Sequence, residues 1–270
     1  MLPEKKFKRY AIEVEKEQHF ERLVSELHEC FPNVGYLVNE ENGKTTIEFY
    51  LPEDVAIPER ISQNWSVNEL GYESQQWLDD LRGKFKGVNV AGTRIVPPWE
   101  EHDEDDLVIY PGMAFGTGEH ASTQLALELL AILPLQGKSL LDVGTGSGIL
   151  SIFAKKRGCS SVRGVDIDSI SIENALENAK LNRVDITFEV ADAYELSGEY
   201  DIVCANLVTD LLLNLESILQ SLSKEFLVLS GVPVEDYDKV LSTFGEPYLA
   251  VFGQDWVAFV YKKSIIRAQI

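Results

Sequence analysis

The chain has 270 residues and 45% of them are hydrophobic, so it can bury one substantial core and a smaller second one. Its 24 Lys and Arg residues stand against 44 Asp and Glu residues, and the formal net charge of −20 disfavours nucleic acid and anionic membranes as partners but attracts basic ones. The cysteines are far apart, and neither an apolar leader nor a run of about 20 apolar residues is present, so we expect a cytoplasmic protein without a metal site, disulfide framework or membrane span.

Residues 1–62 predict a small α+β domain. Their hydrophobic periodicity indicates a strand over residues 7–14, a helix over 17–30 and a hairpin over 34–51 that turns at an Asn-Gly pair. This order fits a ferredoxin-like domain, which could recognise a substrate protein. A dimerisation domain or a purely structural one is the open alternative. Residues 63–87 then predict a linker that contains a helix.

Residues 88–270 are expected to form the second and larger domain. It begins with a predicted strand over residues 88–96. Residues 100–106 then contain six acids in seven positions, a pattern typical of a solvated loop. An acidic lip that attracts a cationic substrate is the alternative interpretation.

The next segment, PGMAFGTGEHAST at residues 111–123, is a glycine-rich loop with several hydroxyl side chains. Ser122 or Thr123 can cap the helix that begins there. Helix capping does not explain the aromatic side chain of Phe115, which is suited to cover a bound ligand. His120 could act as a base, although a histidine in a loop is more often a hydrogen-bonded structural group.

The sequence LLDVGTGSGIL at residues 140–150 predicts a buried strand, a tight glycine turn and the start of a helix. A second apolar run, 162–165, ends at Asp166, where a carboxylate can accept hydrogen bonds from both hydroxyls of a ribose. Turns that bind dinucleotides need a third glycine at the position that Ile149 occupies here. Asp142 precedes the turn, and its negative charge suits a cation better than a phosphate. The stretch therefore favours S-adenosylmethionine, a sulfonium, over NAD or a turn without a ligand.

From residue 140 onward, predicted strands and helices alternate. This order is typical of a doubly wound parallel sheet, which binds ligands at the carboxyl ends of its strands. Three successive strand ends carry a polar side chain, namely Asp166, Asp192 and Asn206, and we expect them to share one crevice with the glycine turn. A terminal hairpin over residues 248–261 should make the sheet mixed, with one antiparallel strand.

Four motifs, in this order, resemble the class I S-adenosylmethionine-dependent methyltransferases: PGMAFGTGEHAST, LLDVGTGSGIL, GVDID at 164–168 and VCANL at 203–207. The GMAFGTG loop is specific to the PrmA-type ribosomal protein L11 methyltransferases among them, and the resemblance covers residues 66–263. It implies an α/β, Rossmann-like methyltransferase domain over residues 88–270, behind a substrate-recognition domain.

The same resemblance implies an enzyme that moves methyl groups from S-adenosylmethionine to lysine side chains or the N-terminal amine of the basic ribosomal protein L11, with S-adenosylhomocysteine as the product. Methylation of another protein or of a small molecule is the alternative, as is a non-catalytic binding module that keeps the fold. We expect a monomer that binds no nucleic acid.

The resemblance also implies roles for individual residues. Asp166 would hold the ribose hydroxyls, and Asp192 would lie beside the adenine. Asn206 would face the cofactor and the incoming amine, which we expect it to position through its side-chain carbonyl; the alternative is that it caps a helix beginning at Leu207. The other expected cofactor contacts are Phe115, Thr117, Ser122, Thr123, Gly144, Thr145, Gly146 and Ile167, with the two glycines under the methionine moiety.

Overall fold

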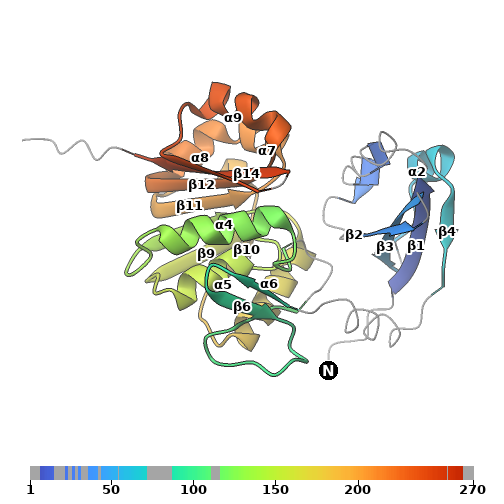
Figure 1. Ribbon diagram of the computed structural model, residues 1–270, viewed down its shortest axis with the longest axis horizontal. Coiled ribbons are helices and arrows are strands. Elements are labelled where there is room, and N and C mark those ends of the chain that lie inside the picture. Colours follow the sequence, from blue (N-terminus) through green and yellow to red (C-terminus); the bar gives the residue numbers. More distant parts are fainter. Residues whose placement is uncertain are drawn as a thin grey trace, which may run out of the picture. The chain divides into compact units, whose positions relative to one another are not determined.

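The computed structural model describes residues 7–14, 22–23, 26–27, 30–31, 36–41, 44–53, 55–71, 87–110, 116–253 and 255–263. The chain divides into two compact units at about residue 85 (Figure 1). No helix in the described part of the chain is both long and apolar enough to cross a membrane. Phe115, the predicted ligand cover, lies outside the described residues, as does most of the predicted helix over 17–30.

The first unit contains a four-stranded antiparallel sheet in the order β2-β3-β1-β4. Helical residues lie between β1 and β2, and the short helix α2 precedes β4, so the element order is the β-α-β-β-α-β order of ferredoxin-like domains. Its core packs Ile12 of β1 against Ile47 and Phe49 of β3, all 0% exposed. The elements are β1 (Phe7–Val14), β2 (Tyr36–Glu41), β3 (Lys44–Pro52), α2 (Glu59–Asn64) and β4 (Val67–Glu69).

Strand β4 lies beyond the predicted domain boundary at residue 62. It pairs with β1 from Val67 to Glu69, so the predicted linker over 63–87 contributes the last strand of the first sheet. The three predicted segments 1–62, 63–87 and 88–270 otherwise stay a prediction.

The second unit begins with a three-stranded sheet of β5 (Val88–Val90), β6 (Thr93–Val96) and β7 (Leu107–Val108). The prediction of one strand over 88–96 is wrong, because Ala91 and Gly92 adopt φ angles of +52° and +71° and fold the segment into a hairpin. Residues 101–105 of the acidic stretch are exposed, as expected of a solvated loop.

The main sheet of this unit has seven described strands in the order β10-β9-β8-β11-β12-β14-β13. Neighbouring strands from β10 to β12 are parallel, and β14 is antiparallel to both β12 and β13. The predicted doubly wound, mixed sheet with its C-terminal antiparallel strand is therefore confirmed. The strands are β8 (Ser139–Val143), β9 (Ser161–Asp166), β10 (Thr187–Val190), β11 (Tyr200–Asn206), β12 (Ser223–Pro233), β13 (Leu249–Phe252) and β14 (Trp256–Lys262).

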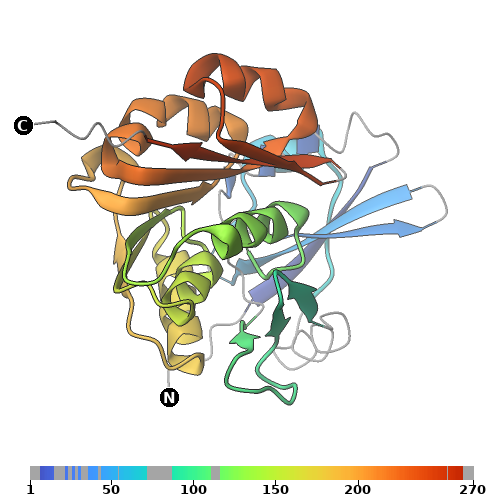
Figure 2. The same ribbon diagram turned by 60° about the vertical axis from the view of Figure 1, so that its left-hand side comes forward.

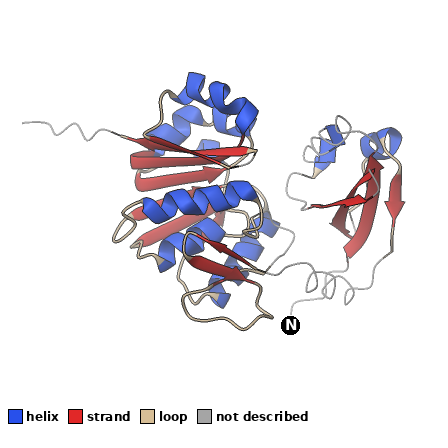
Figure 3. Cartoon of the chain, in the orientation of Figure 1, coloured by secondary structure: helices blue, strands red, loops and turns tan. Residues whose placement is uncertain are grey.

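Helices cover both faces of this sheet (Figures 2 and 3). Adjacent residues of one strand point into different cores: Leu140 packs with α4, α5 and α6, and Leu141 packs with α7, α8 and α9. Both side chains are 0% exposed, as expected of a parallel sheet buried on two sides. The helices are α4 (Ala121–Ile132), α5 (Ile149–Lys156), α6 (Ser169–Leu181), α7 (Thr209–Asn214), α8 (Glu216–Leu222) and α9 (Tyr237–Phe244), with 3-10 turns η1 (Ala193–Glu195) and η2 (Val234–Asp236).

At the opposite edge from the strand ends that carry the predicted site, Asp201 joins the starts of β11 and β8. Its carboxylate accepts hydrogen bonds from the Ser139 backbone N–H at 2.8 Å and from the Ser139 hydroxyl at 2.9 Å. The backbone hydrogen bond is the main cause of a pKa for Asp201 below the 3.8 of an unperturbed aspartate. The carboxylate is thus favoured in the folded state.

We expect Asp201→Ala to lower the free energy of unfolding at pH 7 by about 1–3 kcal/mol, since it leaves a Ser139 donor without its acceptor. A folded-state pKa that is depressed gives stability that is complete above the unfolded pKa and is lost as the pH falls through the folded one. The difference in the free energy of unfolding between wild type and variant, measured with urea, should therefore shrink below about pH 4. Asp185→Ala, at an exposed site, is the control, and an equal, pH-independent effect in both variants would contradict this reading.

Candidate functional site

The predicted site residues lie where the order of the strands reverses. From β8 the chain continues to β9 and β10 on one side, while β11 lies on the other side of β8 and leads to β12. In such sheets ligands bind in the crevice outside the carboxyl ends of the two strands at this reversal. The turn that begins at Gly144 follows β8, and Asn206 is the last residue of β11. Two sequence motifs, some 60 residues apart, therefore meet at one crevice.

The glycines of the turn are required by close approach as well as by conformation. Gly144 has a φ of +73°, and a Cβ there would collide with the side chain of Leu207. Gly148 has a φ of +80° and caps α5, where a Cβ would lie 3.0 Å from atoms of both Ala175 and Phe188. Alanine at either position would force the turn away from its neighbours.

Asp142 does not face the crevice. Its side chain is 0% exposed, and one carboxylate oxygen accepts hydrogen bonds of 2.8 Å from the hydroxyls of both Thr145 and Ser151. Burial raises the pKa of this carboxyl. The carboxylate therefore supports the turn from inside, and the interpretation that its charge favours a cationic ligand stays a prediction.

The two acids of GVDID have different tasks. Asp166 ends β9 and is 9% exposed, and its carboxylate accepts hydrogen bonds from the backbone N–H of Gly146 at 3.0 Å and of Asp168 at 3.1 Å. Burial raises its pKa. A carboxylate has about four lone-pair sites, so Asp166 retains acceptor capacity for a ribose. Asp168 instead caps α6 by accepting from the N–H of Ile170.

Two large apolar side chains are exposed beside Asp166. Ile167 is 65% exposed, and Val190, which lies opposite Asp166 in the pairing of β10 with β9, is 56% exposed. Each offers exposed apolar surface that a flat base could cover. Ile167 was among the predicted residues and Val190 was not, although its position directly before Ala-Asp at a strand end was a usable signal. Asp192 is exposed and caps η1 by accepting from the N–H of Tyr194 at 3.0 Å.

The described part of the glycine-rich loop, residues 116–123, leads into α4. The helix is capped by His120, whose Nδ1 accepts from the Ser122 backbone N–H, so the prediction that Ser122 or Thr123 is the cap is wrong. The His120 ring also bonds the Ser122 hydroxyl at 2.8 Å and meets Trp256 edge-on at 4.7 Å. Burial lowers its pKa, which suits a neutral acceptor at a helix N-terminus. Thr117 is half-buried, whereas Ser122 and Thr123 are fully buried.

The side-chain amide of Asn206 is only partly hydrogen-bonded. Its side-chain Nδ2 donates to the hydroxyl of Thr123 at 3.2 Å, while its Oδ1 is buried and has no hydrogen-bond partner among the described residues. The alternative that it caps a helix is excluded, because α7 begins at Thr209 with Val208 at its cap position. A buried acceptor without a partner is a group that a hydrogen-bond donor on a bound ligand could satisfy.

The site residues at the carboxyl ends of the strands offer hydrogen-bond acceptors and apolar surface to a ligand. In the described residues no group of three or more His, Cys, Asp or Glu side chains could hold a metal ion.

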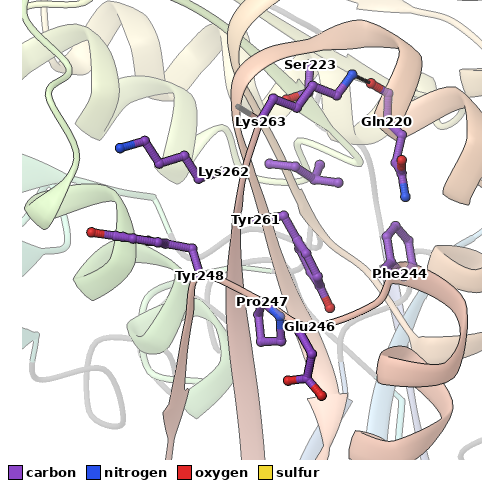
Figure 4. Close-up of a pocket in the computed structure, with 10 residues that line it drawn as sticks. Gln220, Ser223, Phe244, Glu246, Pro247, Tyr248, Tyr261, Lys262 and Lys263 are labelled. Carbon is purple, nitrogen blue, oxygen red and sulfur yellow. Dashed lines mark hydrogen bonds between the residues drawn. The ribbon is translucent and has the colours of Figure 1, made fainter. Parts of the chain in front are cut away.

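An open cavity of about 750 Å³ lies at the other edge of the sheet, between the start of β12 and the end of β14 (Figure 4). Its lining includes Tyr261 and Lys263, whose ammonium donates to the Gln220 carbonyl, but none of the predicted site residues.

Comparison with known proteins gives a consistent result. A family model described as ribosomal protein L11 methyltransferase (PrmA) matches residues 8–264. The chain is 37% identical over 227 residues to the ribosomal protein L11 methyltransferase of Dictyoglomus thermophilum, covering 76% of this chain and 75% of that protein. It is 34% identical over 247 residues to the protein of that name from Caldicellulosiruptor saccharolyticus, covering 82% of each. The crystal structure of the ribosomal protein L11 methylase from Lactobacillus delbrueckii subsp. bulgaricus is similar with a TM-score of 0.60 and 31% identity, covering 64% of this chain and 95% of that one.

We expect Gly144→Ala to lower the free energy of unfolding more than Gly137→Ala does. Both glycines have left-handed backbones, with φ angles of +73° and +76°, and forcing alanine into that region costs about 1–2 kcal/mol. A Cβ at Gly137 meets open space, whereas a Cβ at Gly144 also displaces Leu207, which adds about 1–3 kcal/mol. Urea unfolding of both variants measures the difference, and equal losses would show that the turn is not closely packed.

Proposed function

Since the chain belongs to the ribosomal protein L11 methyltransferase (PrmA) family, we propose that it transfers methyl groups from S-adenosylmethionine to amino groups of ribosomal protein L11. The family match over residues 8–264 carries this proposal. The resemblance seen in the sequence motifs is confirmed, and so is the α/β fold. The alternatives of another acceptor or of a non-catalytic module are not favoured, because the most similar relatives reported above are named as methyltransferases of this protein.

The crevice at β8 and β11 fits S-adenosylmethionine. Asp166 has acceptor capacity for two ribose hydroxyls, and Ile167 offers its exposed side chain to the adenine, with Asp192 beside it. The turn from Gly144 to Gly146 would pass under the methionine moiety. Of the remaining predicted contacts, Thr117 is half-buried, Thr145 supports the turn through Asp142, and Phe115, Ser122 and Thr123 stay predictions.

The bound donor supplies an electrophilic methyl group, and its neutral thioether product needs no acid to protonate it. The protein must therefore align the amine with that methyl group, a contribution that reaches about 7–11 kcal/mol in well-oriented systems. Asn206 would do so by accepting a hydrogen bond from the amine at its Oδ1, which fixes the direction of the nitrogen lone pair; the lack of a partner for Oδ1 among the described residues supports this role.

The amine must also lose a proton before it reacts. A lysine side chain, with an unperturbed pKa of about 10.4, is protonated at neutral pH, whereas an N-terminal amine at about 7.7–8.0 is close to ready. Removal from water lowers the pKa of either group, so water can accept the proton without a dedicated base. His120 is not needed for this step, because its Nδ1 is held by Ser122 at the start of α4.

The charge of the chain supports a basic protein as the partner. A formal net charge of −20 attracts basic surfaces and opposes direct contact with nucleic acid. We propose that the protein works as a cytoplasmic monomer, and that residues 1–62 recognise the substrate.

The function is tested by incubating the chain with S-adenosylmethionine that carries a labelled methyl group and with purified ribosomal protein L11. We expect label on L11, at lysine or N-terminal amines located by mass spectrometry of its peptides. A mixture of other ribosomal proteins is the control. If only a different protein carries label, that protein and not L11 is the methyl acceptor. Binding of S-adenosylmethionine without transfer to any of the proteins would indicate a binding module.

Asn206→Ala should lower kcat by about 10²-fold through loss of alignment. The free energy of unfolding should fall by about 1 kcal/mol at most, since only the hydrogen bond to Thr123 is lost. Asn206→Asp keeps an oxygen acceptor and should retain more turnover than the alanine variant. Steady-state kinetics, calorimetric titration of S-adenosylmethionine and urea unfolding separate these effects. Lost stability with turnover intact would point to a purely structural residue.

A further inference from the structure

We propose that Asn178 is a positioning residue for binding of the methyl donor, an inference that rests on the function proposed above. Asn178 lies in α6 and is 0% exposed. Its Nδ2 donates to the carbonyl of Ser147 at 2.8 Å, and its Oδ1 accepts from the backbone N–H of Tyr110, also at 2.8 Å. One planar amide therefore sets the distance between the glycine turn and the segment that follows β7.

Ser147 provides a second connection from the same turn. Its side chain is 1% exposed, and its hydroxyl donates to the carbonyl of Gly116 at 2.5 Å. Gly116 is itself buried and directly precedes Thr117, the first described residue predicted to contact the donor. Through Ser147, the turn is thus joined to Tyr110 by way of Asn178 and to Gly116 directly. Two walls of the crevice, the turn and the loop before α4, are held at a fixed spacing.

These hydrogen bonds decide the spacing because Asn178 and Ser147 are both buried. If the Asn178 amide is removed, the buried Ser147 carbonyl loses a partner that water cannot replace, and the half-buried Tyr110 N–H loses its acceptor. The turn and the loop then shift to recover hydrogen bonds. A ligand that needs the original spacing binds only the fraction of molecules that still has it, so its apparent affinity falls by that fraction.

Asn182 offers a matched control one helical turn further along. It is 9% exposed, its Oδ1 accepts from the N–H of Val108 at 3.0 Å, and its Nδ2 donates to the carbonyl of Val108 at 2.6 Å. It also anchors the β7 segment to the helix that carries Asn178, but makes no hydrogen bond to the glycine turn. Loss of the Asn182 amide should lower the free energy of unfolding without moving the glycine turn.

The test compares variants of the full chain by calorimetric titration of S-adenosylmethionine, steady-state kinetics and urea unfolding. We expect Asn178→Ala to raise the Kd and KM for the donor about tenfold and to change kcat at saturating donor by less than about threefold. Asn182→Ala should lower stability by a similar amount and leave the donor Kd within about twofold.

Two further variants keep the test decisive if Asn178→Ala does not fold. Asn178→Asp preserves volume and the acceptor for Tyr110 but puts a carboxylate oxygen against the Ser147 carbonyl, so its donor Kd should also rise about tenfold. Ser147→Ala keeps the carbonyl that accepts from Asn178. It removes the hydroxyl, which donates to Gly116 and accepts from the Ile149 N–H at 3.4 Å, and should give a smaller rise.

Equal donor Kd values in the Asn178 and Asn182 variants would overturn this inference while the proposed function stands. A wild-type chain that does not bind S-adenosylmethionine would overturn the proposed function, and the positioning role with it.

Discussion

The buried carboxylate of Asp142 is the interaction on which the crevice depends. A charge removed from water is costly unless it is hydrogen-bonded. Here the hydroxyls of Thr145 and Ser151 donate to one oxygen, and the Cys204 thiol lies 3.5 Å from the other. Because these partners belong to the glycine turn, to α5 and to β11, a single side chain of β8 connects three of the elements that meet at the reversal of strand order. The glycines allow the turn to pack closely against its neighbours, and the Asp142 carboxylate holds the turn in position.

The side chains at the crevice differ in which of their hydrogen-bonding atoms remain free for a ligand. Asp166 is partly used by the backbone N–H of Gly146 and retains capacity for hydroxyl groups. Asn206 is held by Thr123 through its nitrogen only, so its oxygen remains available. The arrangement at Asp166 suits retention of the methyl donor. The arrangement at Asn206 suits orientation of the amine that receives the methyl group. Alignment of two bound groups is the main requirement of methyl transfer, and it needs rigid acceptors more than it needs a strong base.

The sequence predicts much of this arrangement, for identifiable physical reasons. Alternating strands and helices require a parallel sheet, whose carboxyl ends then collect polar residues such as Asp166 and Asn206 at one edge. Errors arise where a residue acts against its usual preference: Ala91 takes a left-handed turn conformation, and His120 caps a helix beside a serine and a threonine that more often do so. Asn178 escapes prediction because its partners outside α6 lie 31 and 68 positions away in the chain, and an asparagine within a helix has no local signature.

Strand β14 is the last of the described strands, yet it occupies an interior position of the sheet, between β12 and β13. During synthesis β12 therefore presents an unprotected edge, and β13 has no partner among the described strands until residues 256–262 have left the ribosome. Val257, Ala258 and Phe259 are fully buried, so the same few residues that complete the ladder also seal both cores. The sheet can be completed only after residues 256–262 have been made, and a nascent chain that stops before them exposes strand edges that can pair with other chains.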